Sequence, residues 1–302
     1  MVEEKLLNLP LIELLKRANK IREDCVGKKL ELCSILNAKS GICNQDCKFC
    51  AQSSKYKTGA PIYPLKEKKE ILEAAKRVLD IGAERFGIVT SGKTLTNDEV
   101  YKICDAISQI KNKVKIKLCA SLGKLDFKSL KLLKEAGLSR YHHNIETSKK
   151  FYPRIVTTSN FKERIETIKI AKSVGLEVCS GGIIGMGESW QDRVDMALLL
   201  KKLDVDSVPI NILVPIKGTP LENKEPISCL DAIKTIAIFR IILKDKIIKI
   251  AAGRETLFGD FQGLGFLAGA NGMLIGGYLT IKGRSIEADH RLVAEIKRIW
   301  RN

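Results

Sequence analysis

Short runs of apolar residues alternate along the chain with longer segments in which apolar and polar positions follow a helical period. The short runs are rich in Val, Ile and Leu and are too short to be isolated helices, so they predict strands. We expect eight strands, at 30–36, 85–90, 114–120, 140–145, 177–184, 207–214, 247–252 and 272–279.

The longer segments predict amphipathic helices between these strands. An N-terminal helix is expected at about 10–24, and the others near 66–81, 96–111, 126–136, 161–174, 189–203, 228–243, 256–268 and 285–300. Gly82, Gly137 and Gly175 each follow a helical segment, where a left-handed C-terminal cap favours glycine. The helix ends are therefore indicated by local chemistry as well as by period.

Eight strand–helix units in one direction predict an α/β fold, a parallel sheet closed as a single (β/α)8 TIM-type barrel. An open doubly wound sheet is the competing architecture. No low-complexity linker or internal repeat divides the chain, so we expect one domain. Its parts are an N-terminal helical extension (1–28), the barrel core (29–285) and a C-terminal helix (286–302).

In such a barrel the active site lies at the C-terminal ends of the strands. Here those ends are polar or built from small residues, at 37–41, 90–92, 142–146, 179–182, Asn211 and 253–255. Strands that only pack a core rarely end in so many polar groups. The sequence therefore predicts a barrel interior that holds a ligand.

Composition narrows the class of protein. The chain has 302 residues, 45% of them apolar and 29% charged, and a formal net charge of +17. The lysines are scattered and no basic-aromatic recognition motif is present, so we interpret the charge as a solvated exterior and expect no nucleic-acid partner. The chain contains no run of about 18 uncharged apolar residues, so no membrane span is predicted. The N-terminus lacks the succession of basic, apolar and small residues that marks a secretory signal. We therefore expect a cytoplasmic protein with no membrane partner.

The cysteines point to chemistry. There are nine, and in a reducing compartment thiols are more often metal ligands or catalysts than disulfides. Cys43, Cys47 and Cys50 follow the first strand in a C-x3-C-x2-C run. Zinc normally requires a fourth nearby Cys or His, and none is close. Three thiolates suit a 4Fe-4S cluster with one iron open to an exchangeable ligand, with a zinc knuckle or buried thiols as the alternative.

This spacing resembles that of the radical S-adenosylmethionine (SAM) enzymes, and the chain is most similar to the biotin synthase family among them. The matching segments cover roughly residues 28–280 in the family's order. They are 41–59 (GICNQDCKFCAQSSKYKTG), 141–148 (YHHNIETS), 151–152, 155–158 (IVTT), 163–164, 178–187 (VCSGGIIGMG), 207–221 (SVPINILVPIKGTPL), 252–255 (AGRE) and 268–271 (AGAN). The segments 207–221 and 252–255 are far more specific than the cysteine run.

The resemblance implies a radical SAM sulfurtransferase that performs the last step of biotin biosynthesis. The open iron of the 4Fe-4S cluster is implied to bind SAM and to release a 5′-deoxyadenosyl radical from it. That radical removes hydrogen from dethiobiotin, and an auxiliary iron–sulfur cluster supplies the sulfur that closes the ring of biotin. Since two C–H bonds are broken, two SAM molecules are consumed. A reductant such as flavodoxin or ferredoxin and a homodimer are also implied.

Site residues are carried over by matching positions. Those implied to bind SAM are Phe49, Thr90, Asn144, Glu146, Arg164, Gly181, Gly182 and Ile183. Those implied to bind dethiobiotin are His142, Asn144, Asn211 and Thr280. An arginine fork suits a carboxylate, and an amide both donates and accepts hydrogen bonds. The chain departs from the family at Glu146, where Asp is commoner, and at His142, where Asn is usual.

A larger departure concerns the auxiliary cluster. In the family it is a 2Fe-2S cluster held by three strand cysteines and an arginine. Cys119, Cys179 and Arg254 match three of these positions, but Gly87 stands where the remaining cysteine would be. Since glycine cannot bind iron, the usual ligand set is broken.

Two further cysteines offer a compensation. Cys33 lies in the first predicted strand and Cys25 just upstream of it. We hypothesise that Cys25, Cys33, Cys119 and Cys179 enclose an auxiliary cluster of four irons, with Arg254 as a donor beside it. A 2Fe-2S cluster on a rearranged subset is one alternative, and incidental buried thiols at Cys25 and Cys33 are another.

The remaining features have ordinary interpretations or favour rival functions. Cys104 and Cys229 lie in predicted outer helices, where core packing is expected. A sister radical SAM enzyme, such as a hydrogenase maturase or methylornithine synthase, is the first rival function. An RNA-modifying or RNA-binding protein, suggested by the net charge, is the second.

Overall fold

The computed structural model describes residues 6–279 and 283–301. Its strands are all parallel and hydrogen-bonded in the order β5-β4-β3-β2-β1-β9-β8-β7-β6. A further pair, Cys179 with Ser207, joins β5 to β7 and closes the ring. The strands are β1 (Glu31–Lys39), β2 (Arg85–Thr90), β3 (Lys117–Ser121), β4 (Arg140–His142), β5 (Glu177–Cys179), β6 (Gly182–Ile184), β7 (Ser207–Ile212), β8 (Ile247–Ile250) and β9 (Gly272–Leu274). The predicted TIM-type barrel is therefore confirmed, and the open sheet is excluded.

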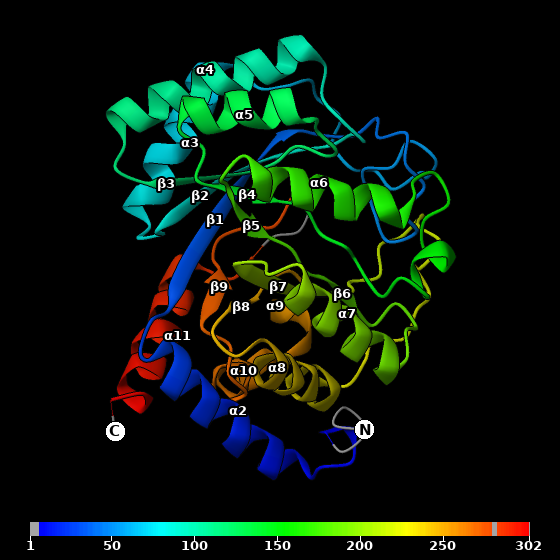
Figure 1. Ribbon diagram of the computed structural model, residues 1–302, viewed down its shortest axis with the longest axis vertical. Coiled ribbons are helices and arrows are strands. Elements are labelled where there is room, and N and C mark those ends of the chain that lie inside the picture. Colours follow the sequence, from blue (N-terminus) through cyan, green and yellow to red (C-terminus); the bar gives the residue numbers. More distant parts are fainter. Residues whose placement is uncertain (1–5, 280–282, 302) are drawn as a thin grey trace.

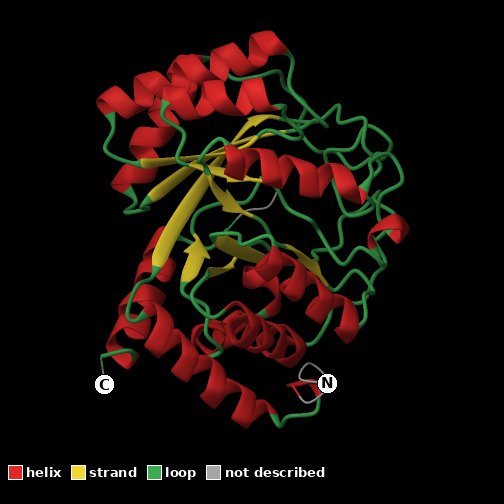
Figure 2. Cartoon of the chain, in the orientation of Figure 1, coloured by secondary structure: helices red, strands yellow, loops and turns green. Residues whose placement is uncertain are grey.

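Helices surround the strands, which lie at the centre of the molecule (Figures 1 and 2). They are α2 (Leu11–Val26), α3 (Lys68–Asp80), α4 (Asn97–Lys113), α5 (Phe127–Ala136), α6 (Phe161–Ser173), α7 (Trp190–Lys202), α8 (Cys229–Leu243), α9 (Arg254–Leu257), α10 (Gln262–Leu267) and α11 (Ile286–Ile299), with single 3-10 turns η1 (Tyr152–Arg154) and η2 (Gly259–Phe261). In the described part of the chain, no helix has the length and apolar character needed to span a bilayer.

Local sequence explains where these helices begin. Thr96, Asn160 and Ser189 cap α4, α6 and α7, and each belongs to a capping box with the acidic residue three positions later. Such caps satisfy backbone N–H groups that have no partner inside the helix. At the other end, Gly137 adopts the left-handed conformation, with φ of 117°, after α5.

The structure divides two of the predicted elements. The predicted strand 177–184 is divided into β5 and β6, because the chain turns toward β7 at Gly181. A Cβ atom there would lie 2.0 Å from the carbonyl oxygen of Pro209, so only glycine permits this approach. The predicted helix 256–268 is likewise divided into α9, η2 and α10, around Gly259 with φ of 48°.

The N-terminal helix packs against the outside of the barrel. Helix α2 lies against α8, and α11 lies close by (Figure 1). Leu14 and Ala18 of α2 are fully buried in this contact, and the Arg22 guanidinium stacks on the ring of Trp300 at 4.3 Å. Because α2 packs outside the barrel, the barrel interior is lined by residues of the strands and of the loops that follow them.

Candidate active site

The loop after β1 carries Cys43, Cys47 and Cys50, and backbone hydrogen bonds curl it tightly. The N–H of Cys50 donates to the carbonyl of Cys47 at 2.9 Å, and the N–H of Cys43 donates to that of Gln52 at 3.1 Å. Ile42, just before Cys43, has φ of 49°, a strained value for a β-branched residue. Strain of this kind is common where a site must be held in one geometry.

A second segment pins this loop from outside. The Asp46 carboxylate accepts hydrogen bonds from the backbone N–H of Thr157 at 2.9 Å and of Thr158 at 3.1 Å, and from both threonine hydroxyls. These bonds hold the pKa of Asp46 below its ordinary value. The 155–158 segment therefore acts as a clamp on the cysteine loop.

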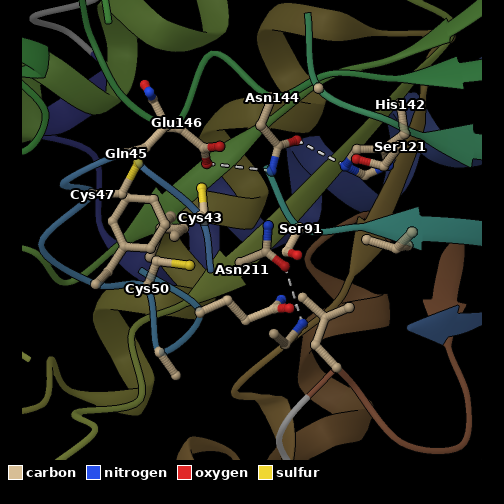
Figure 3. A pocket seen from close by; sticks show the side chains of 18 of the residues that line it. Cys43, Gln45, Cys47, Cys50, Ser91, Ser121, His142, Asn144, Glu146 and Asn211 are labelled. Carbon is tan, nitrogen blue, oxygen red and sulfur yellow. Dashed lines mark hydrogen bonds between the residues drawn. The ribbon is translucent and has the colours of Figure 1, made fainter. Parts of the chain in front are cut away.

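All three thiols line a cavity of about 300 Å³ at the C-terminal ends of the strands, which we call the outer cavity (Figure 3). Burial raises the pKa of the Cys50 thiol to about 11 and raises that of Cys47 as well. Among the described residues, no three Cys, His or carboxylate side chains are close enough to share one metal ion. A donor set that shares a cavity without converging on a single ion fits a multi-atom cluster better than zinc.

Polar side chains from the end of β4 form the facing wall of the outer cavity. His142 Nε2 lies 3.1 Å from Asn144 Oδ1, and the Asn144 amide donates to Glu146 Oε2 at 3.4 Å (Figure 3). The N–H of Gly181 also donates to Asn144 Oδ1, at 3.1 Å. The three predicted residues of this segment therefore form one hydrogen-bonded row.

Arg164 reaches this row from α6. Its guanidinium donates to the Asn144 carbonyl at 2.9 Å and to the Tyr152 hydroxyl at 2.8 Å, and it lies 3.4 Å from the Glu146 carboxylate. Burial opposes its charge, but Glu146 and Tyr152 raise the pKa of Arg164. A fixed guanidinium beside the thiol loop suits recognition of a carboxylate.

The other predicted SAM-binding residues divide into two groups. Phe49, Thr90 and Ile183 line the outer cavity, and the buried Thr90 hydroxyl has no protein partner. Gly181 and Gly182 do not line it. They instead allow strands to approach, since a Cβ at Gly182 would lie 2.3 Å from the Glu146 carbonyl.

A second, smaller cavity of about 90 Å³ lies deeper in the barrel, and we call it the inner cavity. Cys33, Cys119 and Cys179 all line it, as does Gly87. His142 and Asn211 line both cavities, so they mark the boundary between them. The Asn211 amide already donates to the Gly182 carbonyl at 3.1 Å and accepts from the Ala252 N–H at 3.2 Å. Thr280 lies outside the described residues.

Electrostatics distinguish the thiols of the inner cavity. Burial raises the pKa of the Cys33 thiol to about 12 and raises that of Cys119. Burial acts in the same direction on Cys179, but His142 and Lys249 beside it lower its pKa overall. Of the three thiols, Cys179 is therefore the one whose surroundings favour the thiolate form.

The structure corrects two predicted ligands of the auxiliary cluster. Cys25 is exposed near the end of α2, outside the barrel, and is absent from the lining of the inner cavity. Arg254 is also absent from that lining, because its guanidinium is bound to Asp289 at 2.7 Å and to Gln262 at 2.5 Å. Arg254 thus fastens α11 to the barrel and does not face the thiols.

The cations that do line the inner cavity are Arg85, Arg140 and Lys249, which the sequence interpretation missed. A signal was available, because Lys249 lies inside the otherwise apolar β8, and Arg85 and Arg140 are the first residues of β2 and β4. Glu31, at the start of β1, is the anion buried among them. Buried charges of this kind are rare unless they are paired or bind a ligand.

Comparisons with known proteins agree with this geometry. Residues 38–200 match the Radical SAM superfamily, and residues 209–297 match the Biotin and Thiamin Synthesis associated domain. The chain is 54% identical over 299 residues to the biotin synthase of Thermotoga petrophila, covering 99% of each chain. It is 58% identical over 274 residues to that of Thermotoga neapolitana, covering 90% of this chain and 98% of the relative.

Solved structures show the same fold at lower identity. A methylornithine synthase structure is similar with a TM-score of 0.84 at 22% identity, covering 97% of this chain and 91% of that one. The FeFe-hydrogenase maturase HydG from Carboxydothermus hydrogenoformans has a TM-score of 0.80 at 20% identity, covering 97% and 77%. At such identity these likenesses establish only the barrel. The full-length relatives decide the assignment: the chain belongs to the biotin synthase family of radical SAM enzymes.

Proposed function

We propose that this protein converts dethiobiotin to biotin, using SAM as the source of a radical and a second iron–sulfur cluster as the source of sulfur. One structural observation supports the proposal independently of family membership. The barrel contains two adjoining cavities with separate cysteine sets, and His142 and Asn211 lie at their junction. A substrate held at this junction touches both a radical source and a sulfur source.

In the outer cavity, Cys43, Cys47 and Cys50 would hold the 4Fe-4S cluster. When bound, the cluster and SAM supply a 5′-deoxyadenosyl radical strong enough to break an unactivated C–H bond. Arg164 would bind the SAM carboxylate, and Glu146 would accept hydrogen bonds from hydroxyl or amino groups of SAM. Phe49, Thr90 and Ile183 complete the lining and exclude water from the reacting atoms.

At the junction, His142 and Asn211 would recognise the ureido ring of dethiobiotin. The Asn211 amide keeps one N–H and one carbonyl lone pair free after its two backbone bonds. His142 is held by Asn144, which fixes the plane of its ring. A urea group both donates and accepts, and this pair of side chains can meet both requirements.

In the inner cavity, Cys33, Cys119 and Cys179 would hold the auxiliary cluster, which we propose to contain four irons. Three thiols remain for it once Cys25 is excluded, so a group other than a cysteine of this chain completes the set. Cys33 takes over from the absent cysteine at Gly87, since both residues line this cavity from adjacent strands. Iron and sulfide counting with Mössbauer spectroscopy decides between a four-iron and a 2Fe-2S cluster.

The same proposal implies an electron donor, a cellular compartment and an oligomeric state for the enzyme. SAM cleavage needs an electron, which a low-potential carrier such as flavodoxin or ferredoxin would supply. We propose a cytoplasmic homodimer in which the barrel core and both terminal helices act as one catalytic unit.

Anaerobic product analysis tests the function directly. Protein reconstituted with iron and sulfide is incubated with SAM, a reductant and dethiobiotin, and a matched sample omits dethiobiotin. Biotin together with 5′-deoxyadenosine supports the proposal, with the deoxyadenosine exceeding the biotin because two C–H bonds are broken. Deoxyadenosine without biotin favours a sister enzyme, and tight RNA binding without SAM cleavage favours the RNA-protein alternative.

A further inference from the structure

Four charged side chains form a buried cluster at the inner end of the barrel. Glu31, Arg85, Arg140 and Lys249 come from β1, β2, β4 and β8, and each is at most 5% exposed. None of them touches the outer cavity, where SAM is proposed to bind. The catalytic roles proposed above make no use of them.

Glu31 is the centre of this cluster. Its Oε1 lies 2.6 Å from an Arg140 nitrogen and 2.8 Å from Lys249 Nζ, and its Oε2 lies 2.7 Å from Arg85 Nε. One carboxylate therefore positions three cations. Because strand residues two apart share a face, Glu31 and Cys33 of β1 point to the same side.

The cations carry more charge than this carboxylate balances. Three positive groups against Glu31 leave an excess of two. Among the residues that the structure describes, only the half-exposed Glu177 offsets it further, through Arg85 and Arg140. Buried charge without a counterion is costly, so a cavity with this excess favours an anion. The excess lies beside thiols that are proposed to bind iron.

Two of the cations are aimed at individual sulfurs. Lys249 Nζ lies 2.9 Å from Cys33 Sγ, and Arg85 approaches Cys119 Sγ at 3.9 Å. Glu31 pairs with both of these cations, with Lys249 at 2.8 Å and with Arg85 at 2.7 Å, and so restrains their positions. Donors and charges around cluster sulfurs set the reduction potential of an iron–sulfur cluster.

We infer that Glu31 is a positioning residue for the auxiliary cluster, holding Lys249 and Arg85 against the cluster's cysteine sulfurs and fixing the charge that sets its reduction potential. This inference rests on the proposal that the inner cavity holds a cluster. Removing the carboxylate leaves the cations unbalanced and favours the more negative, reduced state of the cluster. Removing Lys249 has the opposite effect.

The test compares variants whose charges change in opposite directions. Glu31→Gln keeps the side-chain shape and removes a negative charge, whereas Lys249→Gln removes a positive one. The midpoint potentials of both clusters are measured by EPR-monitored titration in the same sample, so the outer-cavity cluster is an internal reference. Asp289→Asn, at a buried carboxylate that pairs with Arg254 away from both cavities, is the matched control.

We expect Glu31→Gln to raise the auxiliary potential and Lys249→Gln to lower it. Each should shift the oxidised-to-reduced ratio by roughly tenfold at fixed potential, about 59 mV for one electron. The double variant restores the net charge, so its auxiliary potential should return toward the native value. If Glu31→Gln alone does not fold, the double variant is compared with Lys249→Gln, and the difference between them gives the effect of Glu31. Shifts in the same direction, or no shift in either variant, overturn the inference. If the unmodified protein holds only one cluster, the proposed function fails instead.

Discussion

His142 Nε2 lies 3.1 Å from Asn144 Oδ1, and the same imidazole lines both cavities of the barrel. Burial lowers the pKa of His142, but the sulfur of Cys179, which also lines the inner cavity, raises it overall. One side chain thus connects the row of Asn144 and Glu146 in the outer cavity with the thiols of the inner cavity. Since His142 borders both cavities, mutations there and in each cavity can distinguish SAM cleavage from sulfur insertion.

Replacing His142 with Ala should impair sulfur insertion more than SAM cleavage. The methyl side chain loses the interaction with Cys179, and a lost hydrogen bond to a charged group costs about 1.5–3 kcal/mol, or roughly ten- to hundredfold in rate. Biotin and 5′-deoxyadenosine are quantified in the same reaction. His290→Ala, on the exposed side of α11, should leave both unchanged. An equal fall in both products for His142→Ala would contradict the assigned role.

The two cysteine sets should fail in different ways. Alanine at Cys43, Cys47 or Cys50 should abolish 5′-deoxyadenosine formation, because the outer cluster loses a ligand. Alanine at Cys33, Cys119 or Cys179 should leave some cleavage but stop biotin formation.

The controls for this comparison come from cysteines outside the cavities. Cys25→Ala and Cys104→Ala should retain both activities and the full iron content, since neither residue lines a cavity. Identical failure of both sets while the outer cluster is intact would refute the division of labour. A loss of inner-cavity iron in Cys25→Ala would restore Cys25 as a ligand.

Arg164 should contribute to SAM affinity through the geometry of its fork. Arg164→Ala should raise the KM for SAM by roughly ten- to hundredfold, since a charged hydrogen bond is worth about 1.5–3 kcal/mol. Arg164→Lys keeps the charge but cannot hold Asn144 and Tyr152 together, so it should recover only part of the loss. Full activity of the Lys variant would mean that charge alone is sufficient.

Gly182 should resist substitution for a steric reason. A Cβ at this position would lie 2.3 Å from the Glu146 carbonyl and 2.6 Å from Met196 Sδ, so Gly182→Ala should lower the free energy of unfolding by about 1–3 kcal/mol. Gly263→Ala is the matched control, because the nearest atom there is 3.9 Å away and the residue lies in α10. Urea unfolding should show that the control variant is unchanged or slightly stabilised.

Asp204 should make stability depend on acid pH. Lys172 and Lys246 hydrogen-bond its carboxylate and lower its pKa to about 2, so its contribution is complete above the unfolded pKa and is lost as the pH falls toward 2. Because the group is exposed, the contribution is only about 0.2–1 kcal/mol. Asp204→Asn should be less stable by this amount at pH 7, and the urea unfolding curves of the two proteins should begin to converge below about pH 4 and meet near pH 2. A constant difference at all pH values would exclude the ion pairs as its cause.

Periodicity and local spacing predicted much of this molecule. The eight predicted strand segments all contain strands, and the cysteine run lies at the strand ends as expected, because both depend on short-range patterns. The division at Gly181 depends on the carbonyl of Pro209, which is distant in sequence. No local pattern contains that contact.

The ligand set of the inner cavity was harder to predict, for a physical reason. Cys25 and Cys33 are close in sequence, but α2 continues to Val26 and leaves Cys25 in solvent outside the barrel. Lys249 and Arg254 are both basic and only five positions apart, yet Lys249 is within β8 and Arg254 begins α9. Where a strand ends decides which of two such residues faces the cavity, and strand ends are the least certain part of a sequence interpretation.

We expect the two cysteine sets to hold two distinct iron–sulfur clusters inside one barrel. Mössbauer spectroscopy of anaerobically reconstituted, iron-57-labelled protein, recorded before and after SAM is added, distinguishes one cluster from two. Two sets of iron sites should appear, and SAM should perturb only the set that disappears in the Cys43→Ala variant. A single set of iron sites, or spectra that are the same with and without SAM, would show that the barrel does not hold two clusters with separate roles.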